Sequence, residues 1–183
     1  MAVSAPAPGK AAKIMIYYIV TAAPRFRTAR GAAPIFPYRQ VSAMNVLVID
    51  AQGGGIGRQL VAVLKKELPG VLVTAVGANS LATSAMLRAG ADQGATGENA
   101  VVVNCRKADV IMGPVGIVIA DALWGEITPA MAVAVGQSAA RRVLIPINHC
   151  DNVVVGVPDT NVGRLIREAV AQIREFCPPA PSP

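Results

Sequence analysis

The chain has 183 residues, of which 53% are hydrophobic, 4% aromatic and 15% charged, a composition that predicts one folded domain and excludes a disordered or collagen-like protein. The net charge of +6 lies entirely in residues 1–43, because the 11 Lys and Arg side chains beyond them balance all 11 acids. Beyond residue 43 only Trp124 and Phe176 are aromatic. We therefore expect no nucleic-acid partner.

Residues 1–43 predict a disordered or non-native extension outside the folded domain. Lys10 and Lys13 precede a seven-residue apolar run, a faint outline of an export signal, but this run is at the short limit of length and Pro24 and Arg25 follow soon after it, which favours the first interpretation. We expect the domain to begin at Met44 and to cover residues 44–177. The Pro-rich residues 178–183 are expected to be a frayed tail.

The expected elements alternate between apolar runs typical of buried strands and amphipathic segments typical of helices. The strands are expected at 45–49, 71–76, 109–112, 142–147 and 153–157, and the helices at 56–68, 79–89, 96–107, 128–140 and 162–173. This alternation predicts an α/β fold, a Rossmann-like three-layer sandwich with a mostly parallel, doubly wound sheet. In such sheets ligands bind beyond the carboxyl ends of the strands.

A glycine-rich loop, DAQGGGIGR, joins the first strand to its helix. Consecutive glycines let backbone N–H groups turn toward a ligand, and the helix adds the positive end of its dipole. This pattern predicts phosphate binding, and the alternative is a tight turn that only packs helix against strand. The predicted ligand-binding residues are Gln52, Gly53, Gly54, Gly55, Ile56, Gly57, Arg58, Asn79 and Ser80.

The loop departs from the standard nucleotide motifs. The third glycine of G-x-G-x-x-G falls on Arg58, and the first glycine of the P-loop motif falls on Gln52. Against the deviant pattern K-G-G-x-G-K-[ST], the first lysine is missing and Gln59 replaces the hydroxyl, which argues against a triphosphatase. A dinucleotide site usually has an Asp or Glu after the second strand, which binds the ribose hydroxyls, and this chain has Asn79 there.

Other polar residues have two interpretations each. Asp50 either caps the loop's own N–H groups or binds magnesium, and the first is the commoner arrangement. Glu98 and Glu126 are candidate acids or bases, or solvated carboxylates at helix starts. The uncharged helix expected at 128–140 belongs either to the core or to a subunit interface, so homo-oligomer formation stays open.

The sequence argues against a disulfide framework, a metal site, a Cys–His nucleophile pair and a membrane span. Three distant cysteines without a CxxC pair, and a single histidine, His149, argue against a disulfide framework and a metal site, and indicate a reduced cytoplasmic compartment. His149 and Cys150 are sequence neighbours, so we expect their side chains to diverge, which disfavours a nucleophile pair. The apolar stretch 110–120 is too short for a bilayer, which needs about 20 residues, so no membrane contact is expected.

From about Met44 to Glu175 the chain resembles a bacterial family of small proteins known only as a domain of unknown function. The stretches that carry this resemblance are VIDAQGGGIG (48–57), NSLATSAML (79–87), ATGENA (95–100), GPVG (113–116) and LWGEITP (123–129). Ala51 stands where the family has glycine, and His149 stands where it has another basic residue. The resemblance implies a single Rossmann-like domain and assigns no activity.

The expected function is binding of a small phosphate-bearing ligand, a nucleotide or dinucleotide such as NAD(P), through the loop at Gly53 to Arg58. Catalytic residues stay unknown. If the protein is an enzyme, we expect cofactor-dependent, oxidoreductase-like chemistry rather than triphosphate hydrolysis, because the cofactor brings the reactive atom. The alternative is a non-enzymatic regulatory or interaction protein in which the glycine-rich loop is structural.

Overall fold

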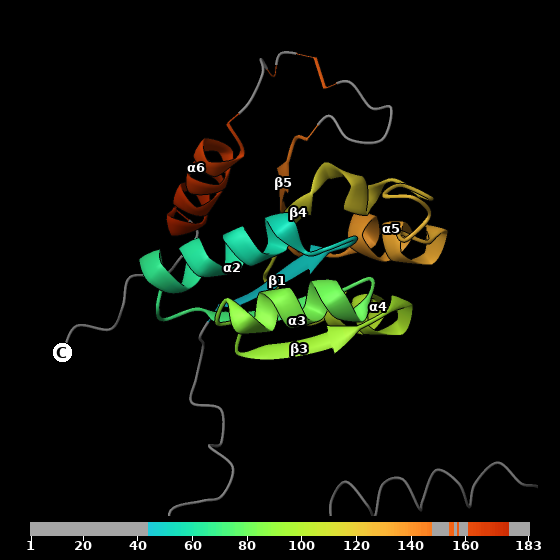
Figure 1. Ribbon diagram of the computed structural model, residues 1–183, viewed down its shortest axis with the longest axis horizontal. Helices are drawn as coiled ribbons and strands as arrows, with labels where there is room; N and C mark the ends of the chain where they lie inside the picture. The colour runs from blue at the N-terminus through green and yellow to red at the C-terminus, as the bar shows by residue number, and fades with distance from the viewer. Residues whose placement is uncertain (1–43, 148–153, 156, 158–160, 176–183) are drawn as a thin grey trace, which may run out of the picture. The chain divides into compact units, whose positions relative to one another are not determined.

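The computed structural model describes residues 44–147, 154–155, 157 and 161–175 (Figure 1). The strands in this part of the chain are β1 (Asn45–Asp50), β2 (Leu72–Gly77), β3 (Gln93–Thr96), β4 (Val110–Pro114) and β5 (Arg141–Ile145). The helices are α2 (Gly55–Glu67), α3 (Ser80–Arg88), α4 (Glu98–Cys105), the 3-10 helix η1 (Val115–Val118), α5 (Pro129–Gln137) and α6 (Val162–Arg174). The predicted alternation of strands and helices is confirmed.

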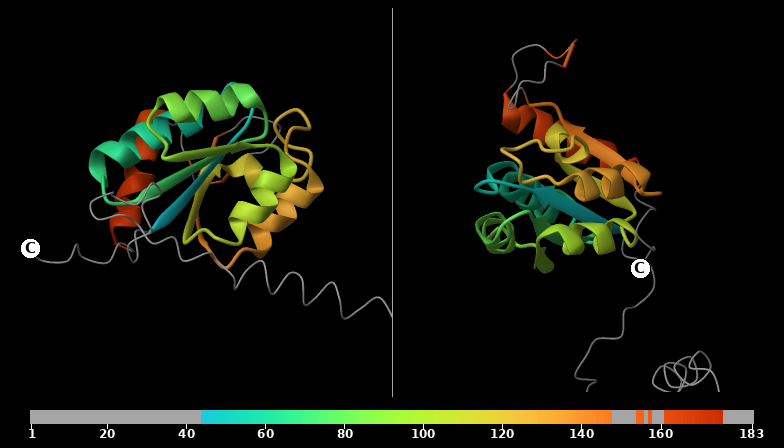
Figure 2. Two further views of the ribbon diagram at one scale, coloured as in Figure 1. Left: turned by 90° about the horizontal axis from the view of Figure 1, so that it is seen from below. Right: turned by 90° about the vertical axis from the view of Figure 1, so that its right-hand side faces the viewer.

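All five described strands are parallel and form one sheet in the order β3-β2-β1-β4-β5. Helices α2, α3 and α6 cover one face, whereas α4 and α5 cover the other (Figure 2). The Rossmann-like, doubly wound sandwich expected from the sequence is therefore confirmed. The chain order reverses its direction along the sheet at β1, which places the β1 and β4 carboxyl ends at the switch point where such folds bind ligands.

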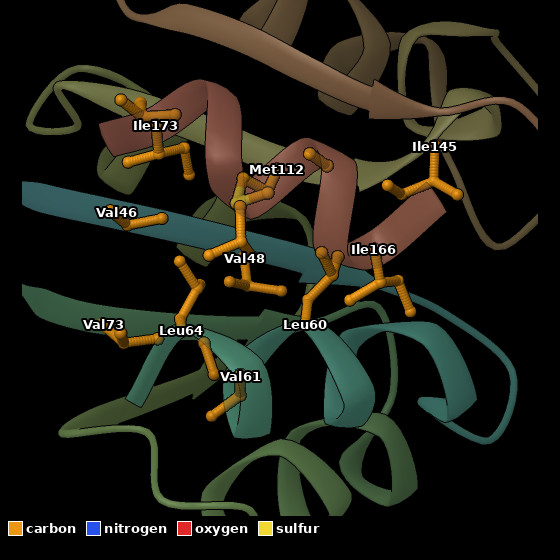
Figure 3. Close-up of a cluster of buried hydrophobic side chains, with 14 of the residues drawn as sticks. Val46, Val48, Leu60, Val61, Leu64, Val73, Met112, Ile145, Ile166 and Ile173 are labelled. Atoms are coloured by element: carbon orange, nitrogen blue, oxygen red, sulfur yellow. The ribbon is translucent and has the colours of Figure 1, made fainter. Parts of the chain in front are cut away.

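Strand β1 lies at the centre of the sheet and all six of its residues are buried. Val46 and Val48 point into the layer of α2 and α6, where they meet Leu60, Leu64 and Ile166 (Figure 3). The alternate β1 residues belong to the cluster on the opposite face, under α4 and α5. Burying each large side chain contributes about 1.5–3 kcal/mol, so this two-sided core anchors the loop that follows β1.

Strand β3 is an element that sequence reasoning missed, because its residues Gln93–Thr96 are small or polar and mostly exposed. It forms the edge of the sheet beside β2. The Thr83 hydroxyl of α3 contacts the Thr96 hydroxyl at 2.7 Å and donates to the Ala95 carbonyl at 3.1 Å. Pairing with β2 and contacts made by α3 therefore hold this strand in the sheet, and local propensity contributes little.

The strand expected at 153–157 is wrong where the structure describes it. Val154, Val155 and Val157 are not in a strand, and the Val157 N–H donates to the Val154 carbonyl at 3.4 Å, as in a turn. Residues 153 and 156 lie outside the described residues, as do the polar group at 148–151, the extension at 1–43 and the tail at 178–183.

Helix α5 begins as its sequence predicts, because Thr128 caps it and Pro129 occupies its first position. It ends at Gln137 rather than near residue 140, since Ser138 leaves the helix and its hydroxyl donates to the Cys105 carbonyl at 2.6 Å. Met131 and Val135 face the core, whereas Val133 is 52% exposed. No helix within the described residues has the length and apolar character that crossing a bilayer requires.

Candidate functional site

The glycine-rich loop occupies the carboxyl end of the central strand, where it turns the chain from β1 into α2. The Gly54 N–H donates to the Ala51 carbonyl at 3.0 Å and closes the turn. Gln52 and Gly54 have left-handed backbones, with φ of 53° and 67°. Gly54 must be glycine, because a Cβ there would lie 2.7 Å from the Ala82 Cα of α3.

Asp50, the last residue of β1, is a buried carboxylate that binds the glycine-rich loop, and only 3% of its surface is exposed. Its Oδ1 accepts the Ala51 N–H at 2.8 Å, and its Oδ2 accepts the Gly57 N–H at 2.6 Å. Burial raises the pKa of the Asp50 carboxyl, and the backbone hydrogen bonds oppose that shift without cancelling it. The capping role is confirmed, since both carboxylate oxygens bind the loop's own N–H groups.

Two backbone donors of the loop remain open. The N–H groups of Gly53 and Gly55 have no acceptor within the described part of the chain. Both residues are exposed, and a Cβ on either would meet no atom within 4 Å. Gly55 begins the 13-residue helix α2, whose first turn holds no acid, so the helix dipole adds a positive potential at the same place. This arrangement suits an anion.

The open donors lie between two hollows. One pocket, of about 340 Å³, is lined by Asp50 to Gly53, Gly55, Ile56, Pro114, Gly116, Leu123 and Ile147. A second hollow, of about 430 Å³, lies between α2 and α3 and is lined by Gly53, Gly55, Arg58, Ala85, Arg88 and Ala89. Arg58 and Arg88 are both exposed there, so this side of the loop offers two cations.

Glu126 reaches the loop from a segment 74 residues further along the chain. Its Oε2 accepts the Gln52 N–H at 2.9 Å and an N–H of the Asn79 amide at 2.7 Å. The Asn79 amide also donates to the Gln52 carbonyl at 2.9 Å, and its oxygen caps α3 by accepting the Ala82 N–H at 2.9 Å. Asn79, predicted to bind a ribose, thus holds the loop's shape here, and Ser80 beside it is exposed.

The segment that carries Glu126 is a strained turn. Asp121, Leu123 and Trp124 have left-handed backbones with φ between 55° and 61°, an arrangement that costs each non-glycine residue about 1–3 kcal/mol. The turn is closed by the Asp121 N–H, which donates to the Ile127 carbonyl at 2.8 Å. Leu123 is buried and lines the 340 Å³ pocket, whereas its neighbour Trp124 is 91% exposed.

Glu98 takes no part in the loop. It is the first residue of α4, and its Oε2 accepts the Thr128 hydroxyl at 2.5 Å, which joins the starts of α4 and α5. Its position fits the helix-start interpretation better than an acid or base at the loop. No group of three or more His, Cys, Asp or Glu side chains suited to a metal ion occurs among the described residues.

A family model described as "Domain of unknown function (DUF3842)" matches residues 45–178. No curated protein matches the sequence. Among solved structures, the chain is similar to a dodecameric FMN-dependent UbiX-like decarboxylase from Escherichia coli O157:H7, with 18% identity and a TM-score of 0.40. That match covers 72% of this chain and 76% of the decarboxylase chain. The likeness concerns the fold, and no cofactor or activity is carried over from it.

Proposed function

We propose that this chain, which belongs to the DUF3842 family of domains of unknown function, binds the phosphate of a nucleotide or dinucleotide through residues Gly53 to Arg58. The observation that carries the proposal is the pair of open N–H groups at Gly53 and Gly55, at the start of α2. Backbone donors without side chains above them, at the positive end of a helix, are the usual cradle of a phosphate.

The charges around the loop favour one side of it. Arg58 and Arg88 line the hollow between α2 and α3, and either guanidinium can pair with a phosphate. The carboxylate of Glu126 lies on the other side, where it occupies the Gln52 N–H. We therefore place the phosphate over Gly53 and Gly55, toward the arginines and away from Glu126.

Triphosphate hydrolysis does not fit this loop. It needs a hydroxyl that holds magnesium at the position of Gln59, whose amide instead donates to the Gly55 carbonyl at 3.1 Å. Asp50, the acid beneath the loop, is buried and binds two backbone N–H groups. The ligand is then a cofactor, a substrate or a signal, and NAD(P) is the leading candidate because it brings its own reactive atom.

A thermal-shift screen against NAD(H), NADP(H), FMN, ATP and GTP tests the proposal, because a ligand at 100 times its Kd adds about 2.7 kcal/mol to stability. Gly53→Ala and Gly55→Ala place a methyl group over the open donors in unobstructed space, so both variants should fold normally and lose the shift. Gly70→Ala, also unobstructed but far along the sequence from the loop, is the matched control. Arg58→Ala should weaken binding without unfolding the protein.

The rival function is a non-enzymatic regulatory or interaction protein with a purely structural loop. It predicts no shift with any of these ligands. A ligand that binds Gly55→Ala as tightly as the wild-type protein would also count against the loop as the site. Magnesium-dependent phosphate release that disappears in Arg58→Ala would refute the exclusion of triphosphatase activity.

A further inference from the structure

Trp124 is an exposed indole held on a strained backbone, in the turn whose Glu126 binds the glycine-rich loop. Its side chain is 91% exposed, and its φ of 61° is a conformation that favours glycine. Indole rings normally bury most of their surface, so full exposure on a costly backbone is unusual for this residue type. Backbone strain of this kind persists only where the surrounding structure enforces it.

The surrounding structure does enforce the position of Trp124. The preceding residue, Leu123, is buried and lines the 340 Å³ pocket together with Gln52 and Gly53. Two residues later, Glu126 binds the Gln52 N–H and the Asn79 amide. The backbone of Trp124 is therefore held between a residue that lines the pocket and a residue that binds the glycine-rich loop, while its own side chain projects into solvent.

We propose that Trp124 is the stacking surface for a planar heteroaromatic ring on the ligand whose phosphate lies over Gly53 and Gly55. This inference rests on the proposed function and names the residue that would hold the base of the nucleotide. Indole faces bind flat rings through stacking whatever the ring's hydrogen-bonding pattern. Trp124 is the only aromatic residue in the described part of the chain, so no other described side chain supplies this contact.

A second apolar side chain lies close to the same hydrogen-bonded link. Leu81, in the first turn of α3, is 70% exposed and follows Asn79 by two residues. Asn79 itself binds Glu126, so Leu81 and Trp124 each stand two residues from one end of that contact. Leu81 and Trp124 are therefore two exposed apolar side chains on the two segments that this hydrogen bond joins.

Two ligands distinguish the contribution of the ring to binding from the contribution of the phosphate. Adenosine 5′-monophosphate carries both, whereas ribose 5-phosphate has the same phosphate and sugar without the ring. Trp124 is the only tryptophan in the sequence, so its fluorescence reports directly on the proposed contact. In the wild-type protein we expect adenosine 5′-monophosphate to quench this fluorescence and to bind at least about ten-fold more tightly than ribose 5-phosphate in calorimetry.

Substitutions of Trp124 test whether its indole causes the preference for adenosine 5′-monophosphate over ribose 5-phosphate. Trp124→Ala should lower the affinity for adenosine 5′-monophosphate about ten-fold and leave that for ribose 5-phosphate unchanged, whereas Trp124→Phe should keep most of the preference. Trp124→Gly, for which a φ of 61° is unstrained, serves if the alanine variant fails to fold. Val133→Ala is the control, because this exposed side chain lies on α5 and neither it nor its two neighbours in the chain line a hollow beside the loop.

The outcomes distinguish the two proposals. If both probes bind equally, or if Trp124→Ala weakens both equally, the stacking role is overturned and the phosphate site stands. If neither probe binds, both proposals fail. If Trp124→Ala converts an oligomer into monomers without any probe, the indole belongs to a protein interface and the stacking role is again overturned.

Discussion

Replacing Asp50 with alanine should destabilise the protein by about 2–4 kcal/mol at pH 7. The variant removes the acceptors of the Ala51 and Gly57 N–H groups, which lie at 2.8 and 2.6 Å from the two carboxylate oxygens in a buried place. A hydrogen bond to a charged group is worth about 1.5–3 kcal/mol, so two bonds give about 3–6 kcal/mol. Burial of the charged carboxylate is itself unfavourable, as its raised pKa indicates. Removing that carboxylate therefore offsets part of this sum of about 3–6 kcal/mol, which leaves a net loss of about 2–4 kcal/mol.

Urea unfolding at pH 7 measures this loss as a lower midpoint at unchanged slope. Asp109→Ala is the matched control, because the exposed Asp109 also caps a strand start, with a single bond of 2.7 Å from the Asn45 N–H, and should cost about 1 kcal/mol. The reasoning about Asp50 is refuted if Asp50→Ala costs no more than this control.

The pH dependence of Asp50 runs opposite to that of most structural aspartates. A folded pKa above the unfolded value means that the folded protein binds the proton more tightly. The stability gap between the wild-type protein and Asp50→Ala should therefore be largest below about pH 4 and shrink as the pH rises through the folded pKa. A gap that widens over this range would contradict the raised pKa.

Three further predictions concern other sites. Gly57→Ala should lower Tm markedly, because its Cβ would lie 2.8 Å from the Cβ of Asp50, whose carboxylate is held by two backbone N–H groups. Gly136→Ala, in open space on α5, should raise stability by about 0.5–1 kcal/mol. Burial alone would raise the pKa of Asp92, but hydrogen bonds from the Val73 N–H and from Lys65, together with the Lys65 charge, lower it overall. Asp92→Asn should therefore be less stable than the wild-type protein at neutral pH. This difference in stability should disappear as the pH falls through the folded pKa of Asp92. Burial raises the pKa of the Cys105 thiol to about 11, so mass spectrometry of its peptide should show far slower alkylation at pH 8 in folded than in urea-unfolded protein.

Much of the fold could be predicted because its strands are buried on both faces. The runs NVLVI and VLVTAV are apolar apart from Asn45 and Thr74, as is typical of parallel strands between two helix layers, and they correspond to β1 and β2. The apolar stripe of α6 and the Thr128-Pro129 start of α5 are equally local signals. Strand β3 could not be predicted in the same way, because contacts with α3 hold its short polar sequence in place.

The candidate site likewise has contacts that could be predicted from local sequence and contacts that could not. The role of Asp50 could be predicted because the carboxylate and the N–H groups that it binds lie within seven residues of one another. The link from Glu126 to Gln52 spans 74 residues, and no local pattern indicates it. The left-handed backbone at Trp124 was equally hidden, since the sequence LWGE suggests that conformation at Gly125, which has it, but not at the tryptophan before it.

The central position of β1 has a consequence for how the protein is made. β1 precedes both of its neighbours in the chain, and its residue Val46 pairs with Val110 of β4, 64 residues later. At about 5–20 residues per second, the ribosome needs roughly 3–13 s to reach that partner. Throughout this interval a strand with four consecutive apolar residues, 46–49, has one unpaired edge, so the nascent chain depends on rapid pairing with β2, or on a chaperone, until β4 arrives.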